Sequence, residues 1–211
     1  MMDAYFDFPN NEPAHKTRYN QTMGGYIDPS VQFLGKIKVG FGVIIERNVF
    51  FGGNNFVGWG AKIRPSCQIG FGSEVRHSAW LAPNCTVGKH SVIYNYANLA
   101  MGTRIGDYVY FGTRSTTTNA DDIVLHRDRD FVPKPVSVED GARVATHCCI
   151  GPGLVIGKNC LVGMGSIVTK DVPAQEIWFG NPARHRGFVH KNDVPSAWMD
   201  SVVDRVIREG G

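Results

Sequence analysis

The stretch TTTNADDIVLHRDRDFVPKP, residues 116–135, carries side chains that could move a proton or hold an amine. His126 lies there among the alternating basic and acidic residues 127–130, and a histidine so placed could take a proton from a hydroxyl group. Asp121 and Asp122 could orient a cationic amine. All of these residues also suit a charged loop in water, so their types alone leave a catalytic and a structural interpretation open.

The elements that would position these residues follow a six-residue period. In steps of six from Ile27 to Ile123, sixteen of seventeen residues are Val, Ile, Leu or Phe, and small residues recur four positions later. This period fits neither a long helix nor a long strand, but it fits short strands joined by tight turns, with three hexads closing a triangular coil. We therefore predict an all-β parallel solenoid of about seven coils, each buried by its neighbours.

The period breaks once. It resumes at Val138 in a different phase and continues to Val168, so residues from about 119 to 136 form an excursion from the solenoid wall. Long loops inside regular domains are uncommon and are usually functional. A smooth prism has no pocket, and we expect this arm to project toward a neighbouring subunit and to enclose a site.

Asn95 faces outward by its hexad phase. His77 occupies the same column one coil earlier, and Thr113 occupies it one coil later. The Asn95 amide could accept a hydrogen bond from a substrate amine, or it could satisfy the backbone amides of a turn. A zinc site built from His77, His90 and His147 is not predicted, because these residues differ in hexad phase or lie on distant coils.

Composition narrows the class of protein. The 211 residues suit one domain, and a net charge of +3 with scattered basic residues does not indicate a nucleic-acid partner. No apolar run is long enough for a membrane span, and the first residues do not resemble a signal peptide. Four cysteines occupy the small hexad position, which predicts buried reduced thiols and a cytoplasmic protein: Cys67, Cys85, Cys148 and Cys160.

Three regions are predicted along the chain. Residues 1–26 lack the period and are expected to cap the first coil, and residues 27–187 form the solenoid. Residues 188–211 carry a short helix that starts near Ser196, and capping the last coil is its expected role.

The hexads resemble a known family when two further motifs are added. These are VIGKNCLVGMGSIVTKDVP, residues 155–173, and GNPAR, residues 180–184. Together they resemble the left-handed β-helix acyltransferases, the hexapeptide-repeat family, over roughly residues 27–187. The resemblance implies a left-handed coil, a homotrimer, and an acyl-CoA bound in the groove between adjacent prisms.

A narrower resemblance covers residues 87–119. They resemble the segment before the loop in enzymes that N-acetylate amino groups of nucleotide-linked sugars in bacterial surface-glycan pathways. The matching positions are Asn95 and the pair Thr118 and Asn119, whereas Leu154 stands where some of those enzymes carry a histidine. The galactoside and maltose O-acetyltransferases instead place a catalytic histidine near the loop, and His126 is the nearest equivalent here.

The resemblance also implies roles for later residues. By similarity to the O-acetyltransferases, the Thr146 amide is the expected oxyanion donor, with His147 beside the cofactor. The remaining cofactor contacts are expected from two glycines that let a ligand approach the backbone, two phosphate-binding cations and one residue of GNPAR: Gly163, Gly165, Lys170, Arg184 and Asn181.

The sequence therefore predicts an acyl-CoA-dependent acyltransferase, most simply an acetyltransferase. Its predicted acceptor is the amino group of a nucleotide-linked amino sugar. A hydroxyl acceptor needs a base, whereas a neutral amine mainly needs an acceptor that orients it. Two alternatives remain open at this point: a sugar or glycan O-acetyltransferase, and a non-catalytic β-helix that only mediates assembly.

Overall fold

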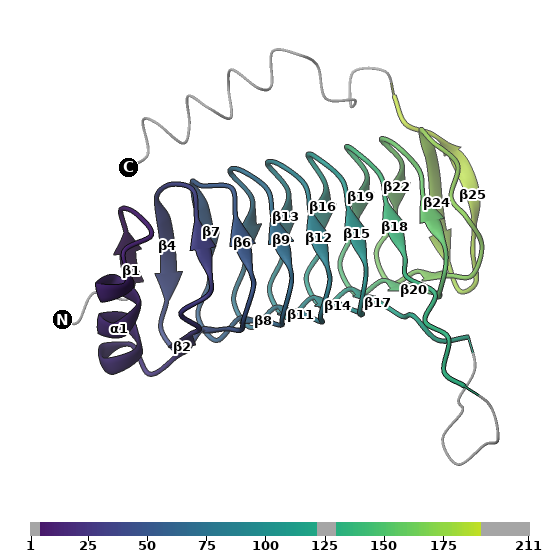
Figure 1. Cartoon of the computed structure of the whole chain (residues 1–211). Coiled ribbons are helices and arrows are strands. Elements are labelled where there is room, and N and C mark those ends of the chain that lie inside the picture. The colour runs from purple at the N-terminus through teal and green to yellow at the C-terminus, as the bar shows by residue number, and fades with distance from the viewer. Residues whose placement is uncertain (1–4, 122–129, 191–211) are drawn as a thin grey trace.

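The computed structural model describes residues 5–121 and 130–190, which form a straight prism of stacked coils with a helix at one end and a hairpin at the other (Figure 1). The prism has three walls, called here sheets A, B and C. Sheet A contains β1 (Tyr5–Phe8), β4 (Ile37–Gly40), β7 (Asn55–Val57), β10 (Glu74–Val75), β13 (Val92–Ile93), β16 (Tyr110–Phe111), β19 (Arg143–Val144), β22 (Leu161–Val162), β24 (Glu176–Gly180) and β25 (Ala183–Phe188).

The other two walls consist of shorter strands. Sheet B contains β2 (Tyr26–Ile27), β5 (Ile44–Ile45), β8 (Lys62–Ile63), β11 (Trp80–Leu81), β14 (Asn98–Leu99), β17 (Thr116–Thr117), β20 (Cys149–Ile150) and β23 (Ile167–Val168). Sheet C contains β3 (Gln32–Phe33), β6 (Phe50–Phe51), β9 (Gln68–Ile69), β12 (Thr86–Val87), β15 (Arg104–Ile105), β18 (Ser137–Val138) and β21 (Val155–Ile156).

The chain visits the sheets in the order B, C, A, and the strands of successive coils from β2 to β24 pair in parallel, as Trp80 does with Asn98. The parallel β-helix predicted from the six-residue period is therefore confirmed, and it matches the left-handed β-helix fold. Sheet B contains eight strands, so the described chain makes about eight coils where about seven were predicted.

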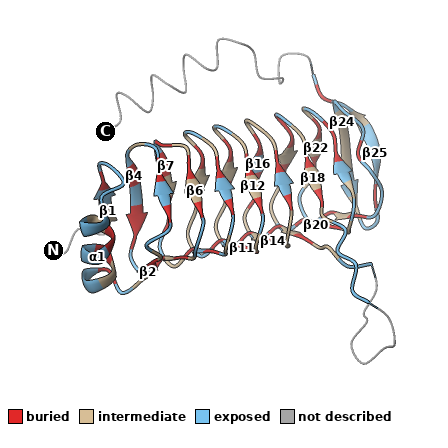
Figure 2. Cartoon of the chain, in the orientation of Figure 1, coloured by how far each residue is buried: buried red, intermediate tan, exposed pale blue. Residues whose placement is uncertain are grey.

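The hexad pattern explains the core. The second residue of each two-residue strand points inward and is buried, as in Trp80–Leu81 and Val92–Ile93, and Figure 2 shows buried residues recurring along the coils. Thr117 is the polar exception in the apolar series. Its hydroxyl lies 2.9 Å from the Thr103 hydroxyl and accepts the Ala100 N–H at 2.8 Å, so its polar group is satisfied inside the core.

The turns between strands share one geometry. The third residue after each strand commonly adopts positive φ, for example Ser66 (61°), Asn84 (61°), Tyr96 (58°) and His147 (59°). Positive φ at the second central residue, after a residue that can be proline, is the pattern of a type II turn. The turn after a sheet A strand is called here the A–B edge, and the turn after a sheet B strand is called the B–C edge.

The insertion leaves the prism at the B–C edge after β17. Paired residues of sheet C are 18 apart before it, from Thr86 to Arg104, and 33 apart across it, from Arg104 to Ser137. The insertion therefore adds 15 residues, close to the predicted excursion, and Val136 is already buried in the wall. The Lys134 N–H donates to the Asn119 carbonyl at 2.7 Å and closes its base, and both stems project from the prism (Figure 1).

The two ends are closed differently. At the first coil, β1 pairs antiparallel with β4, and α1 (Pro13–Thr22) buries Tyr19 and Lys16. At the last coil, β24 and β25 form an antiparallel hairpin. The predicted C-terminal helix lies in residues 191–211, outside the described residues. In the described part of the chain, no helix is long and apolar enough to span a membrane.

Cysteine burial agrees with the sequence analysis. All five cysteines are free, and the four at small hexad positions are buried. Burial raises the pKa of the Cys160 thiol to about 12 and also raises the pKa of Cys148. The Cys148 and Cys160 thiols are therefore protonated at neutral pH, and both are core residues.

Candidate functional site

The A–B edge brings together residues that are far apart in the sequence. Two turn residues per coil stack into two columns along this edge, as successive backbone hydrogen bonds show. Asn95 and Thr146 lie in the first column, and His147 and Gly165 lie in the second. The first column is Phe41, Trp59, His77, Asn95, Thr113, Thr146 and Met164, and the second is Gly42, Gly60, Ser78, Tyr96, Arg114, His147 and Gly165.

Coil spacing sets the distances along this edge. Parallel strands lie about 4.8 Å apart, so Asn95 and Thr146, which are two coils apart, are separated by about 10 Å along the axis. Gly163 and Gly165 lie one coil beyond Thr146. Five of the predicted site residues therefore share one edge of a single prism: Asn95, Thr146, His147, Gly163 and Gly165.

Side chains in the first column satisfy backbone amides of the preceding coil. The Trp59 N–H donates to His77 Nδ1 at 2.9 Å, and the His77 N–H donates to Asn95 Oδ1 at 3.1 Å. Asn95 thus has the structural role that the sequence left open. Its side-chain NH₂ group and the second lone pair of Oδ1 have no partner among the described residues.

This series of side-chain to backbone hydrogen bonds, called here the amide ladder, ends at Asn95. The Thr146 N–H has no acceptor among the described residues, and the next residue in its column is Met164, a thioether that is 76% exposed. Thr146 is only partly buried, so this N–H is left to water or to a ligand. It can bind an external acceptor such as a carbonyl oxygen or an oxyanion.

Different structural constraints explain the two glycines near Thr146. A Cβ at Gly165 would meet nothing within 4 Å, and its φ is +69°, so the edge is open there to a ligand. A Cβ at Gly163 would lie 2.7 Å from the Cβ of Phe179. Packing against β24 therefore explains Gly163 without a ligand.

The second group of predicted residues lies on the B–C edge. Thr118 Oγ1 donates to the Ile150 carbonyl at 3.1 Å, and Asn119 begins the insertion. Asp121 forms an ion pair with Lys134, and the Lys134 hydrogen bond lowers the pKa of that carboxyl. Lys170 is exposed on the same edge.

Hexad phase explains why these groups separate. Asn95 follows a sheet A strand, whereas Thr118 and Asn119 follow a sheet B strand, so sheet B lies between them in one chain. Their spacing in the sequence resembled a motif but did not bring them together. His126 and Asp122 lie outside the described residues.

The end of the prism carries the last predicted cofactor residues. Asn181 lies in the turn between β24 and β25, and Arg184 lies in β25. Both are exposed, and Arg184 Nη1 donates to the Ala183 carbonyl at 2.9 Å. No group of three His, Cys, Asp or Glu residues in the described ranges is placed to hold a metal ion.

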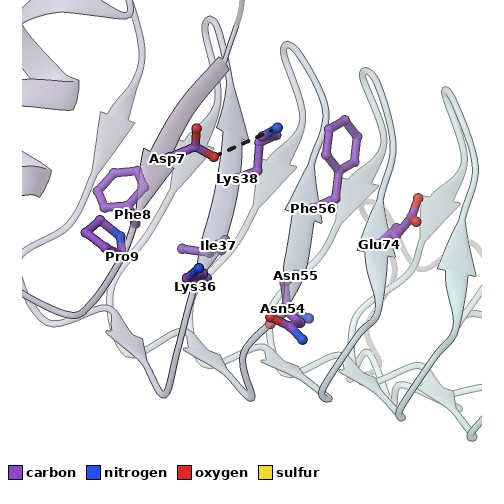
Figure 3. A pocket seen from close by; sticks show the side chains of 10 residues that line it. All are labelled: Asp7, Phe8, Pro9, Lys36, Ile37, Lys38, Asn54, Asn55, Phe56 and Glu74. Atoms are coloured by element: carbon purple, nitrogen blue, oxygen red, sulfur yellow. Dashed lines mark ion pairs between the residues drawn. The ribbon is translucent and has the colours of Figure 1, made fainter. Parts of the chain in front are cut away.

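Two cavities were not predicted from the sequence. The sheet A cavity, of about 630 Å³, lies beside β1 and is lined by two lysines, two acids and apolar residues (Figure 3). The sheet B groove, of about 520 Å³, lies on β8 and β11 and is lined by Gly60, Lys62, Arg64, Ser78, Ala79 and Trp80. The hexad pattern shows which residues point outward, but not which outward side chains leave space between them.

Comparison with known proteins supports the six-residue repeat found in the sequence. The family model for the hexapeptide repeat of succinyl-transferase matches residues 42–75 and 135–170. A galactoside O-acetyltransferase from Escherichia coli (strain K12) is 34% identical over 83 residues, which cover 38% of this chain and 41% of that protein.

A second curated relative acts on an amino sugar. The dTDP-3-amino-3,6-dideoxy-alpha-D-galactopyranose 3-N-acetyltransferase of Aneurinibacillus thermoaerophilus is 42% identical over 52 residues, which cover 25% of this chain and 27% of that protein. Among solved structures, a maltose O-acetyltransferase from Clostridium difficile 630 has a TM-score of 0.46 at 19% identity, covering 65% of this chain and 67% of that one.

The chain spans less than half the length of these curated relatives. The repeats lie in the coils that carry the A–B edge, both before and after the insertion. The chain carries hexapeptide repeats in a parallel β-helix, and the curated proteins described here that are similar to parts of it are acetyltransferases.

Proposed function

We propose that this protein is an acyl-CoA-dependent acetyltransferase that acts on the amino group of a nucleotide-linked amino sugar. The observation that carries the proposal is the Thr146 N–H, a donor without a partner among the described residues, on the same edge as Asn95 and the open backbone at Gly165. Both curated relatives described above are sugar acetyltransferases, which supports the reaction class.

In the proposed reaction, the thioester carbonyl oxygen points at the Thr146 N–H. The neutral amine attacks the carbonyl carbon, a C–N bond forms, and the resulting oxyanion is stabilised by that N–H. The C–S bond then breaks, and the amine proton ends on the CoA thiol. Asn95 lies about 10 Å from Thr146 along the axis and keeps its NH₂ group and one Oδ1 lone pair, which can hold the acceptor sugar and accelerate the reaction by positioning.

Cofactor binding is proposed near the last coils. Gly165 allows the pantetheine arm to approach the backbone, with His147 one coil earlier in the same column. Arg184 and Lys170 are exposed cations that suit the CoA phosphates, with Asn181 beside Arg184.

We further propose a homotrimer. The predicted residues occupy two edges of one prism, so the insertion with Thr118, Asn119, Asp121, Asp122 and His126 would reach the A–B edge of a second copy. Three copies around one axis place each insertion against a neighbour. The free, buried thiols support a cytoplasmic location.

One second function is favoured by a specific observation. The galactoside O-acetyltransferase similarity and the presence of His126 in the insertion support acetylation of a sugar hydroxyl. That reaction needs a base. On the described A–B edge, His77 Nδ1 already accepts the Trp59 N–H, whereas His147 is exposed beside Thr146, so His147 and His126 are the two candidates for that base.

The test is a screen with acetyl-CoA, using thiol release and product mass as readouts. One acceptor set contains nucleotide-linked amino sugars, and the other contains the same sugars with a hydroxyl in place of the amine. We expect turnover only with the amines. Turnover only with hydroxyls would establish the O-acetyltransferase, and an absence of both turnover and acetyl-CoA binding would exclude both enzymes.

A further inference from the structure

The sheet B groove begins at the A–B edge. Two of its lining residues, Gly60 and Ser78, are second-column residues of that edge, and the others lie on the adjoining wall. The next residue in that column is Tyr96, which follows Asn95 directly. The groove therefore lies one coil from Asn95 along the same edge.

The polar groups in the groove are positively charged or neutral. Lys62 is exposed and forms no ion pair with any described residue, and the Ser78 hydroxyl makes no hydrogen bond within the described chain. Arg64 forms an ion pair with Glu46 of the preceding coil but keeps 44% of its side chain exposed. No acidic residue lines the groove.

An exposed indole completes the lining. Trp80 is 41% exposed and points outward from β11, one coil beyond Lys62, with which it is paired in the sheet. Aromatic side chains stack on nucleobases, and lysine and arginine bind phosphate oxygens. One ligand class matches an indole, two cations and a hydroxyl on neighbouring coils: a nucleoside diphosphate.

The sheet A cavity does not match this ligand. Its two lysines, Lys36 and Lys38, share the lining with Asp7 and Glu74: Lys38 lies 4.0 Å from Asp7, and Glu74 is ion-paired with Arg76 (Figure 3). A phosphate group there would meet two carboxylates. Charge complementarity therefore favours the groove over the larger cavity.

We propose that the sheet B groove binds the nucleoside diphosphate part of the acceptor, with the base on Trp80 and phosphates on Lys62, Arg64 and Ser78. This inference rests on the proposed function, because it names where that acceptor binds. It also gives the acceptor a direction, since the sugar then lies toward Asn95 and the amine points toward Thr146.

Acetyl-CoA also contains a nucleoside diphosphate, so its position must be separate. Ser78 and Gly165 lie four coils apart in one column, which corresponds to about 20 Å along the axis. The groove and the proposed cofactor contacts are then far enough apart for both ligands to bind at once.

The experiment is isothermal titration calorimetry of the full chain with dTDP, UDP and GDP as probes, without CoA and with saturating CoA. We expect at least one diphosphate to bind, with an affinity that CoA does not lower. Lys62→Gln and Trp80→Leu should each raise the Kd of that diphosphate at least about tenfold and leave the Kd of acetyl-CoA unchanged.

Two matched variants serve as controls. Lys36→Gln removes the lysine of the sheet A cavity that has no ion pair with a described residue, and Trp59→Leu removes an indole of similar exposure, 46%, from the A–B edge. Both should change the Kd of the diphosphate less than about twofold. If Trp80→Leu alters the mass of the assembly in light scattering, Lys62→Gln decides the assignment, because it leaves the apolar surface intact.

The results that would overturn this inference differ from the results that would overturn the proposed function. Binding of acetyl-CoA without binding of any diphosphate would overturn this inference and leave the acetyltransferase proposal standing. Equal losses in Lys62→Gln and Lys36→Gln, or displacement of the diphosphate by CoA, would also overturn it. A failure to bind acetyl-CoA would instead overturn the proposed function.

Discussion

The A–B and B–C edges are built from the same turn but offer different chemistry to a ligand. The second residue after the strand is proline in four B–C turns: Pro29, Pro65, Pro83 and Pro152. None of the A–B turns between the described strands has proline there. Proline has no N–H, so these four B–C turns lack the donor that every described A–B turn retains.

The retained amides are used in two ways. Those of Trp59 and His77 are bound by side chains of the next coil, whereas those of Asn95, Thr113 and Thr146 have no acceptor in the described chain. The difference teaches that a repetitive wall can leave selected turn amides free, and the proposed acetyl-transfer site uses one of them. The insertion leaves from the other edge, where fewer amides are available.

The largest expected effect comes from giving the A–B edge the proline of the B–C edge. Thr146→Pro removes the proposed oxyanion donor, and the fold tolerates proline at this position, since Ala82–Pro83 occupies the equivalent of Ala145–Thr146. Loss of one oxyanion donor lowers kcat by about 10²–10³. Steady-state kinetics on the best acceptor of the screen measures it.

Thr146→Ala is the matched control, because it keeps the N–H and removes only the side chain. It should retain kcat within about threefold. Equal losses in the two variants would show that the side chain, not the amide, matters. Circular dichroism melting of Thr146→Pro checks that the coil is intact.

The next effect concerns Asn95, which belongs both to the ladder and to the proposed site. Asn95→Ala should lower kcat/KM by about tenfold or more, because the acceptor sugar loses a positioning contact. His77→Ala breaks the same kind of ladder bond one coil earlier, at the Trp59 N–H. If both variants lose activity equally, the role of Asn95 is structural.

The sequence predicted the repetitive wall of the prism better than it predicted the site on its edges. The hexads predicted the solenoid and the buried face because the strand residue that points inward must be apolar in every coil. They also predicted that His77, Asn95 and Thr113 share a column, which the backbone hydrogen bonds confirm.

The site was less predictable. The pairing of Asn95 with Thr118 rested on a spacing, and the structure places these residues on different edges. The free Thr146 amide was expected only by resemblance, because its freedom depends on Met164 in the next coil. The groove around Trp80 was missed because it arises from differences in size between outward side chains of neighbouring coils.

The cap of the first coil also contacts the two edges differently. Changes in the cap are expected to lower stability, and these effects are smaller than the effects on activity described above. At the A–B edge, the Tyr19 hydroxyl donates to the Gly40 carbonyl at 2.7 Å and accepts the Val43 N–H at 3.0 Å. Tyr19→Phe should lower the free energy of unfolding by about 1–2 kcal/mol, because both backbone groups lose a partner. Urea denaturation at pH 7 measures the change, and a loss below about 0.3 kcal/mol would contradict it.

At the B–C edge of that coil, only carbonyls need partners, and Lys16 Nζ donates to those of Pro29 and Val31. Burial lowers the Lys16 pKa from its ordinary value of 10.5, with a smaller opposing effect of Asp28. The unfolded state therefore binds more protons between the folded pKa and 10.5, so this contribution to stability rises with pH in that window. The unfolding free energy of the wild type relative to Lys16→Met should increase from pH 7 to pH 10.5, and a decrease would contradict the assignment.

The smallest expected effect is at His126, in the insertion that leaves the B–C edge. For an amine acceptor, the nucleophile needs no enzyme base once it is neutral, so His126→Ala should change kcat less than about threefold. The pH profile of kcat/KM should then follow the pKa of the substrate amine and should be the same in wild type and variant. For a hydroxyl acceptor, the same change should lower kcat by about 10²–10⁴, and the wild-type profile should show a histidine that the variant lacks. A loss of that size would break the comparison between the edges, because the catalytic base would then come from the insertion at the B–C edge, and the O-acetyltransferase would replace the amino-sugar enzyme as the better proposal.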